Sequence, residues 1–400
     1  MSAANAVLRT VVPGVGMIAV TFGLARYGYG LLLPDMQASL GVDTATAGLI
    51  ASGAYVSYLA ANFAVVWLTA RFGPRLPIGV AAGLAAAGMF TIAVASGVIT
   101  LSVGVLVAGA AAGVAFPPYA DVVARAVPPR RQALSWSAIS SGTGWGVALA
   151  GPVAILLGAR WRIAWLVFAL LALAVGILAV RAAPRRATGP RPLPALSWSW
   201  LICPRSRPLL LSSVLVGVGS SIWWAFSVDA LRAGGLGETA ARSVYATCGA
   251  AGILASVSGA VIARAGLRRF FRAGCVLLAG PFALLDLTAS SIDVALVAAL
   301  LFGVSYNAVI AAQGLWSAAV FAERPSAGLA AVNTALTMGT IIGPTVAGVV
   351  IEHYGYKPAL AGAAVVIALA MVQSPPAGAT RWPHRLTRRS RRQSPAAVSR

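Results

Sequence analysis

The sequence has few charged residues, and acidic side chains are especially scarce. Only 10% of its 400 residues are charged, with nine Asp and Glu against 30 Lys and Arg. Soluble domains carry about 25% charged residues, so this composition excludes an ordinary soluble protein. The two histidines, His353 and His384, are too few for a His-based catalytic triad or a histidine metal cluster.

Lysine and cysteine are also scarce. Lys357 is the sole lysine, so the chain has no G-x-x-x-x-G-K-[ST] phosphate-binding loop, which argues against an ATP-driven pump. The three cysteines, Cys203, Cys248 and Cys275, have no metal-ligand spacing and predict no disulfide framework. We therefore expect neither an enzyme, nor a metal site, nor a cofactor.

Long apolar runs dominate the chain. Hydrophobic residues make up 59% of it, and the mean hydropathy is +0.85. Runs of about 20 residues cross a bilayer as helices, so we predict an all-α polytopic membrane protein with twelve transmembrane helices in two six-helix bundles. The predicted ranges are 11–33, 45–69, 76–96, 100–124, 133–157, 162–180, 208–230, 241–263, 270–289, 294–320, 327–351 and 358–374.

The first of these runs contains an arginine, Arg26, about two-thirds of the way along. A guanidinium at that depth costs at least about 2.5 kcal/mol on insertion scales, so it normally faces a protein interior or a wet cavity. As an α-helix, this run would place Arg26 on one face with Phe22, Gly23 and Tyr29. Arg26 could instead reach toward the membrane surface or pair with an acid. We predict a fixed positive charge at a substrate site.

The basic residues mark one side of the predicted membrane. With both termini in the cytoplasm, 24 of the 30 Lys and Arg fall on the cytoplasmic side, so the positive-inside rule favours this topology. The net charge of +21 is therefore explained by topology, and we expect no nucleic-acid partner. We predict a multi-pass protein of the bacterial inner membrane that acts as a monomer in the lipid bilayer.

Two landmarks repeat along the chain. Arg71, in TARFGPR, matches Arg264, in ARAGLRR, at an offset of 193 residues, and the pair Gly151-Pro152 matches Gly343-Pro344 at an offset of 192. This agreement predicts a duplicated unit, as in many secondary transporters. We expect an N-terminal bundle (1–180), a cytoplasmic connector (181–207), a C-terminal bundle (208–374) and a disordered basic tail (375–400).

Polar residues follow helical stripes on some predicted spans and are nearly absent from the third span of each triplet. Polar stripes on spans 1, 2, 5, 7, 10 and 11 predict a cavity between the bundles, with the third helices facing lipid. For any single stripe, hydrogen bonding between helices is the plainer explanation. The predicted substrate-binding residues are Arg26, Tyr55, Tyr58, Asn62, Trp224, Tyr306, Gln313 and Asn333.

These features resemble the major facilitator superfamily. Twelve spans, a long central loop and the loop after span 2 are similar to that family, whose loop motif is G-x-x-x-D-R-x-G-R-R. Both copies here have alanine, Ala70 and Ala263, in place of the aspartate. The partial span-5 motif does not support an efflux antiporter. The segment LARYGYGLLLP resembles a YbfB-like bacterial branch, which brings no substrate with it.

The resemblance also implies a cytoplasmic gate. We predict gating residues in both copies of the loop and at the inner end of span 4. Asp121 would either latch onto Arg71 or Arg75, with Arg125 available at i+4, or titrate as a site for a coupling proton. Asp35 and Asp229 are expected to be solvated helix ends rather than gates. The predicted gating residues are Arg71, Arg75, Asp121, Arg264 and Arg268.

We therefore predict a secondary active transporter that moves a small organic solute by alternating access. Arg26 favours an anionic solute, because guanidinium binds carboxylate or phosphate in bidentate fashion. One alternative is efflux of amphipathic drugs or metabolites, in which Trp224 and Tyr306 matter more than charge. Another, from a different class, is a membrane sensor or scaffold that does not transport.

Overall fold

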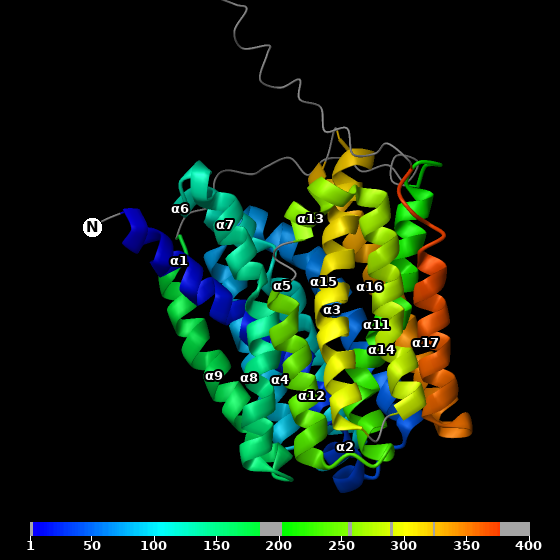
Figure 1. The fold of residues 1–400 in the computed structure, drawn as a ribbon. Helices are drawn as coiled ribbons and strands as arrows, with labels where there is room; N and C mark the ends of the chain where they lie inside the picture. The colour runs from blue at the N-terminus through cyan, green and yellow to red at the C-terminus, as the bar shows by residue number, and fades with distance from the viewer. Residues whose placement is uncertain (1–2, 185–201, 255–257, 289–290, 323–324, 377–400) are drawn as a thin grey trace, which may run out of the picture.

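The computed structural model describes residues 3–184, 202–254, 258–288, 291–322 and 325–376. Every regular element in these ranges is a helix (Figure 1). The predicted connector lies mostly at residues 185–201 and the predicted tail mostly at 377–400, and both of these ranges lie outside the described residues.

The helices form two groups, which we call the N-terminal and C-terminal halves. The N-terminal half comprises α1 (Ala3–Ile18), the π-helix η1 (Ala19–Arg26), α2 (Gly28–Leu40), α3 (Thr44–Phe72), α4 (Arg75–Ala93), α5 (Val98–Ala115), α6 (Pro118–Ala126), α7 (Pro129–Ser140), α8 (Gly142–Leu157) and α9 (Trp161–Ala182). The C-terminal half comprises α11 (Arg207–Ala233), α12 (Glu238–Ile253), α13 (Ser258–Ala265), α14 (Leu267–Thr288), α15 (Ile292–Val320), α16 (Pro325–Tyr354) and α17 (Tyr356–Ala370).

In the described residues, each of the twelve predicted spans overlaps one helix or consecutive helices. Among the described residues, nine helical stretches are long and apolar enough to cross a membrane. The first of them, Leu8–Leu40, joins α1, η1 and α2 into one continuous stretch. The prediction of an all-α, multi-pass membrane protein is confirmed.

The turns after α3 and α13 are alike. Gly73 and Gly266 occupy equivalent positions in the two loop motifs, and both have positive φ angles, 76° and 84°. Side chains other than glycine rarely adopt this region, so each copy of the motif needs glycine at its turn. The shared backbone geometry supports the internal repeat.

The two halves meet along three helix pairs: α2 with α11, α3 with α16, and α8 with α12. Small residues allow close contact there. A Cβ on Gly48 would lie 2.2 Å from the carbonyl oxygen of Pro344, and a Cβ on Gly30 would meet the carbonyl oxygen of Trp224. Transmembrane helices pack closely where glycine lets backbones approach, and these positions have no room for a side chain.

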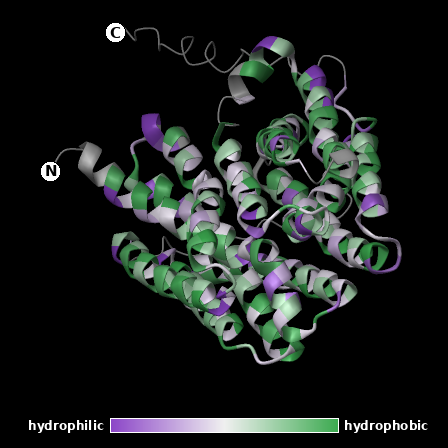
Figure 2. Ribbon diagram, turned by 60° about the horizontal axis from the view of Figure 1, so that its bottom comes forward, coloured by the Kyte–Doolittle hydropathy of each residue, from purple (hydrophilic) through white to green (hydrophobic). Residues whose placement is uncertain are grey.

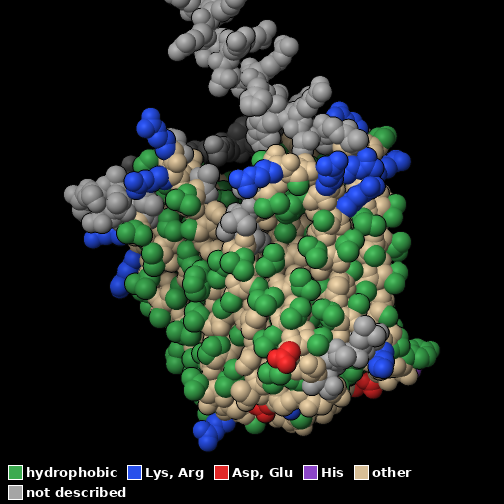
Figure 3. All heavy atoms as spheres, viewed as in Figure 1, with side chains coloured by type: hydrophobic (Ala, Val, Ile, Leu, Met, Phe, Trp, Pro, Cys, Tyr) green, Lys and Arg blue, Asp and Glu red, His purple; other side chains and the backbone are tan. Residues whose placement is uncertain are grey.

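The surface fits a bilayer. Figure 3 shows hydrophobic side chains around the middle of the molecule, most Lys and Arg at the end where α1 begins, and acidic side chains near the opposite end. In Figure 2, hydrophobic and intermediate residues make up most of each helix. Helix α9 exposes large side chains such as Leu170 and Leu178. We call the end where α1 begins the basic end and the opposite end the acidic end.

Candidate functional site

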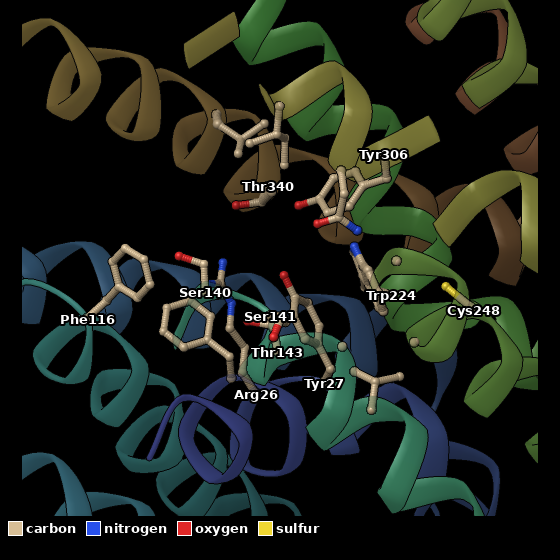
Figure 4. A pocket seen from close by; sticks show the side chains of 18 of the residues that line it. Arg26, Tyr27, Phe116, Ser140, Ser141, Thr143, Trp224, Cys248, Tyr306 and Thr340 are labelled. Carbon is tan, nitrogen blue, oxygen red and sulfur yellow. The ribbon is translucent and has the colours of Figure 1, made fainter. Parts of the chain in front are cut away.

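A cavity of about 220 Å³ lies between the two halves (Figure 4). Its walls come from η1, α3, α7 and α8 on one side and from α11, α12, α15 and α16 on the other, with Phe116 following α5. Its described lining contains no residue of α4, α9, α14 or α17. Those four helices are the ones that the sequence predicts to face lipid.

Arg26 reaches this cavity from the end of the π-helix η1. The amide of Tyr27 donates to the carbonyl of Phe22 over 3.0 Å, a bond to the fifth residue back rather than the fourth. Within η1, Gly23 lies against Gly146 of α8, where an added Cβ would stand 2.4 Å from the Cα of Gly146. The prediction that Arg26 lies on an α-helical face is therefore wrong, because a π-helix places other residues on the face of Arg26. The π-turn brings Tyr27 into the cavity lining next to Arg26.

Aromatic rings surround the guanidinium of Arg26. Its Cζ lies 4.1 Å from the ring centre of Tyr58 and 4.5 Å from that of Tyr55, and Phe22 and Tyr27 lie within 5.6 Å. Cation–π contact stabilises a charge that is largely withdrawn from water. The Nε of Arg26 is buried without a hydrogen-bond partner. The rings therefore compensate the charge only in part.

Aromatic side chains of the C-terminal half form the facing wall. Trp224 stacks on Tyr27 with ring centres 4.1 Å apart and meets Tyr306 edge to face at 5.7 Å. The hydroxyl of Tyr245 donates to the carbonyl oxygens of Tyr27, over 2.7 Å, and of Trp224, over 3.4 Å. A single α12 hydroxyl therefore ties the backbones of both halves together beside the cavity.

The cavity contains most of the predicted binding residues. Arg26, Tyr58, Trp224, Tyr306 and Asn333 line it, and Tyr55 contacts Arg26 from α3.

Two predicted binding residues lie elsewhere. Asn62 is not in the lining, and Gln313 is fully buried with its amide nitrogen donating to Ser212 over 3.2 Å. For these two residues a substrate contact stays a prediction.

Several lining residues were not predicted as binding residues. Tyr27 was missed because its position depends on the π-turn. The α12 residues Cys248, Gly249 and Gly252 form a smooth wall with little polarity, so no polar stripe marks them. Ser141, Thr337 and Thr340 do lie on stripes visible in the sequence, and the structure brings them into the lining.

At the acidic end, ion pairs at the buried carboxylate of Asp35 join the two halves. Asp35 of α2 accepts from Arg242 of α12 over 2.6 Å and from Arg232 of α11 over 3.1 Å. Arg242 is 1% exposed, pairs also with Glu238 and donates to the carbonyl oxygen of Ala154 on α8. The expectation of a solvated Asp35 is wrong, because its partners lie about 200 residues away in the sequence and only folding brings them together.

Hydrogen bonds continue this closure along α3 and α16. Glu352 accepts from the amide of Thr44 over 2.9 Å, and the hydroxyl of Thr345 donates to that of Ser52 over 2.7 Å. Asp229 is not a solvated helix end either, since the Tyr356 hydroxyl donates to its carboxylate.

The predicted gating residues lie toward the basic end. Asp121 lies 3.9 Å from Arg125, its partner one turn along α6. Arg71 lies against the rings of Trp67 and Phe72, and Arg75 begins α4. A latch from Asp121 to Arg71 or Arg75 stays a prediction.

The second copy of the loop motif holds the other two predicted gating residues. Arg264 is exposed near the end of α13, and Arg268 of α14 has a buried Nε without a hydrogen-bond partner. Their role in a gate stays a prediction. In the described part of the chain, no group of three or more His, Cys, Asp or Glu is placed to hold a metal ion.

Comparisons with known proteins identify the fold. The family model described as Major Facilitator Superfamily matches residues 15–264, more than half of the chain. Comparison with curated proteins finds no match.

Solved structures match nearly the whole chain. A crystal structure of a mutant form of the nucleoside transporter NupG superposes with a TM-score of 0.76 at 15% identity, covering 91% of this chain and 99% of that one. A bacterial homolog to the human lysosomal transporter Spinster, in an inward-facing and unoccupied conformation, gives a TM-score of 0.76 at 14% identity, with coverages of 93% and 96%. At these identities the likeness concerns the fold alone.

Proposed function

The chain belongs to the Major Facilitator Superfamily, and we propose that, as a secondary transporter of this family, it moves a small organic anion. It is a transmembrane transporter and not an enzyme. The YbfB-like branch within the family stays a prediction.

The charge of the cavity carries the proposal of an anionic solute. Among the described residues that line the cavity, Arg26 is the only charged one, and no carboxylate neutralises it there. Guanidinium groups bind carboxylates through paired, charge-assisted hydrogen bonds, which are about twice as strong as neutral ones. An anion at Arg26 would therefore complete a site that is otherwise positive.

The distribution of contacts supports alternating access. The contacts between halves from Asp35, Thr44 and Ser52 gather at the acidic end, and the predicted gating residues lie toward the other end. With both termini cytoplasmic, the acidic end faces outward, and this conformation is closed to the outside. Transport then requires these contacts to break while a gate near Asp121 closes.

The proposal also covers the oligomeric state, the location and the driving force. The proposal includes the monomer as the transporting unit. The inner membrane of a bacterium is the proposed location, with an ion gradient or the solute's own gradient as the driving force. A coupling proton at Asp121 remains an alternative to its role in a latch.

Efflux of amphipathic compounds is the second candidate, because six lining residues are aromatic. Resistance profiling of a deletion strain would separate export of such compounds from uptake of an anion. The name of the NupG neighbour points to uncharged nucleosides, and the unneutralised charge of Arg26 argues against them here.

Paired ligands test the proposal. Purified full-length protein is screened by thermal shift against carboxylates and their uncharged amides, because a ligand that binds the folded state raises its unfolding temperature. Uptake of the best carboxylate into proteoliposomes is then measured for wild type, Arg26→Ala and Arg26→Lys. We expect Arg26→Ala to abolish selectivity for the charged member of each pair and Arg26→Lys to retain part of it. Unchanged affinity in both variants would remove Arg26 from the site.

A further inference from the structure

The cavity has a charged wall and an aromatic wall. Arg26 lies on the N-terminal side, and Trp224 and Tyr306 lie on the C-terminal side, with Tyr27 beside them (Figure 4). A ligand between the two walls would meet a guanidinium at one end and ring faces and edges at the other. The arrangement of these two walls therefore restricts the chemical class of the substrate more than the net charge of the site does.

The single positive charge of the site matches one negative charge on the substrate. The other polar lining side chains, such as Ser140, Thr143 and Asn333, are neutral, and the described lining includes no second cation. A dianion in this cavity would keep one charge uncompensated, and burial of an unpaired charge is strongly unfavourable. The site therefore matches a monoanion better than a dicarboxylate.

The facing wall fits an aromatic ring. Trp224 and Tyr306 meet edge to face with an interplanar angle of 70°, and Phe302 stacks behind Tyr306 at 5.5 Å. Aromatic pairs in such arrangements are favoured beyond the area that they bury. The Nε1 of Trp224 is also buried without a hydrogen-bond partner, so this wall, like Arg26, holds an unsatisfied donor.

From this arrangement we infer that the substrate is a small aromatic monocarboxylate, with its carboxylate at Arg26 and its ring against Trp224 and Tyr306. The inference rests on the proposed transport of an anion at the same cavity. The cavity volume of about 220 Å³ has room for a molecule with a single small ring system.

Four probes separate charge from ring. Benzoate carries both features, cyclohexanecarboxylate keeps the charge without an aromatic ring, benzamide keeps the ring without the charge, and phthalate adds a second charge. Equilibrium binding to the full-length protein in detergent is measured for each probe at neutral pH. We expect benzoate to bind about two- to tenfold more tightly than cyclohexanecarboxylate, in line with one aromatic contact. Benzamide and phthalate should each bind at least about tenfold more weakly than benzoate, because a lost or unmatched charge costs more.

Variants assign each preference to its wall. Trp224→Leu should remove the preference for benzoate over cyclohexanecarboxylate and leave the preference for benzoate over benzamide. Trp224→Phe should restore the first preference, which shows that the ring and not the fold is responsible. Arg26→Gln should remove the preference for benzoate over benzamide and leave the preference for benzoate over cyclohexanecarboxylate. The matched controls, Trp145→Leu and Arg269→Gln, change exposed residues outside the cavity lining and should bind all four probes as the wild type does.

The outcomes distinguish the two proposals. If cyclohexanecarboxylate equals benzoate while benzamide binds weakly, the aromatic inference is overturned and transport of an anion stands. If benzamide equals benzoate, transport of an anion fails as well. Phthalate binding more tightly than benzoate would overturn the inference of a single negative charge. If none of the four probes binds, the inference is also overturned.

Discussion

Asp35 and Arg242 form a buried ion pair across the two halves, with 2.6 Å between carboxylate and guanidinium. Removing one partner of a buried pair leaves an uncompensated charge and typically costs about 3–5 kcal/mol. We expect Asp35→Asn to destabilise the conformation closed at the acidic end, because Arg242 and Arg232 both lose their shared carboxylate. Hydrogen–deuterium exchange should then rise in the first turns of α3 and the last turns of α16.

A matched control uses another acidic residue. Asp293, in the first turn of α15, is exposed, so Asp293→Asn should leave exchange in α3 and α16 unchanged. If Asp35→Asn also leaves this exchange unchanged, Asp35 does not hold the halves together.

Gly23 of η1 packs directly against Gly146 of α8. An added Cβ on Gly23 would lie 2.4 Å from the Cα of Gly146, so Gly23→Ala forces the helices apart and should cost about 1–3 kcal/mol of stability. Because η1 carries Arg26, anion binding should weaken as well. Thermal unfolding and benzoate binding measure the two effects separately.

Gly83 on α4 provides the control for this substitution. It also lies within a helix, and a Cβ there meets no atom within 4 Å. Gly83→Ala should therefore be neutral or stabilise the protein by up to about 1 kcal/mol. Equal effects of the two substitutions would show that the packing of η1 against α8 is not tight.

The helices could be predicted from the sequence because membrane thickness fixes the length of an apolar run. The cavity could also be predicted in outline, because stripes containing Tyr58, Tyr306 and Asn333 give helical faces that must avoid lipid. The π-turn could not be predicted. It accompanies a close tertiary contact between Gly23 and Gly146, which are 123 residues apart in the sequence.

Pairings over long distances in the chain were equally inaccessible. The residues next to Asp35 in the sequence suggest the exposed end of a helix. Nothing in this local sequence predicts the ion pairs with Arg232 and Arg242. The wall from α12 was missed for another reason. Gly249 and Gly252 contribute shape without polarity, and such residues are common on helices that pack together.

Tyr245 joins backbone carbonyls of both halves through one hydroxyl group. Tyr245→Phe keeps the ring and leaves the buried carbonyl oxygens of Tyr27 and Trp224 without this donor, at a cost of about 1–3 kcal/mol. The unfolding temperature should fall accordingly. Tyr354→Phe, at a side chain that is 75% exposed, should not change it. A Tyr245→Phe protein as stable as the wild type would mean that other donors satisfy these carbonyls.

Asp43 caps the first turn of α3. The backbone amide and the hydroxyl of Thr46 donate to its carboxylate and lower the pKa of Asp43 below its usual value. Because the folded-state pKa is depressed, the contribution of Asp43 to stability is present at neutral pH and is lost as the pH falls below about 4, through the lowered pKa. Asp43→Ala should cost about 1 kcal/mol at neutral pH, and the difference from wild type should shrink at about pH 3.

Asp43→Asn separates capping from charge. Asparagine caps helices about as well as aspartate does and does not titrate, so this variant should keep the same first-turn protection at neutral and at acidic pH. Hydrogen exchange at the start of α3 gives the readout. If wild type and Asp43→Ala differ by the same amount at both pH values, the role of the carboxylate is contradicted.

The surroundings of Cys203 predict that it is the most reactive of the three cysteines. It lies before α11 and is partly exposed, whereas Cys248 and Cys275 are buried. Its thiol donates to the Oγ of Ser206 over 3.5 Å, and hydrogen bonding with Ser206 lowers the pKa of the Cys203 thiol. N-ethylmaleimide should therefore modify Cys203 first at neutral pH, because the thiolate is the reactive form.

Substitution of Ser206 tests the cause of this reactivity. Ser206→Ala should raise the pKa of Cys203 and slow its modification at neutral pH, and the difference should vanish at a pH where both proteins carry the thiolate. Ser206→Thr keeps a hydroxyl and should restore the rate, which separates the hydrogen bond from any effect on the start of α11. Mass spectrometry of timed samples locates the modified cysteine, and equal rates in Ser206→Ala and wild type at neutral pH would show that the hydroxyl does not activate the thiol.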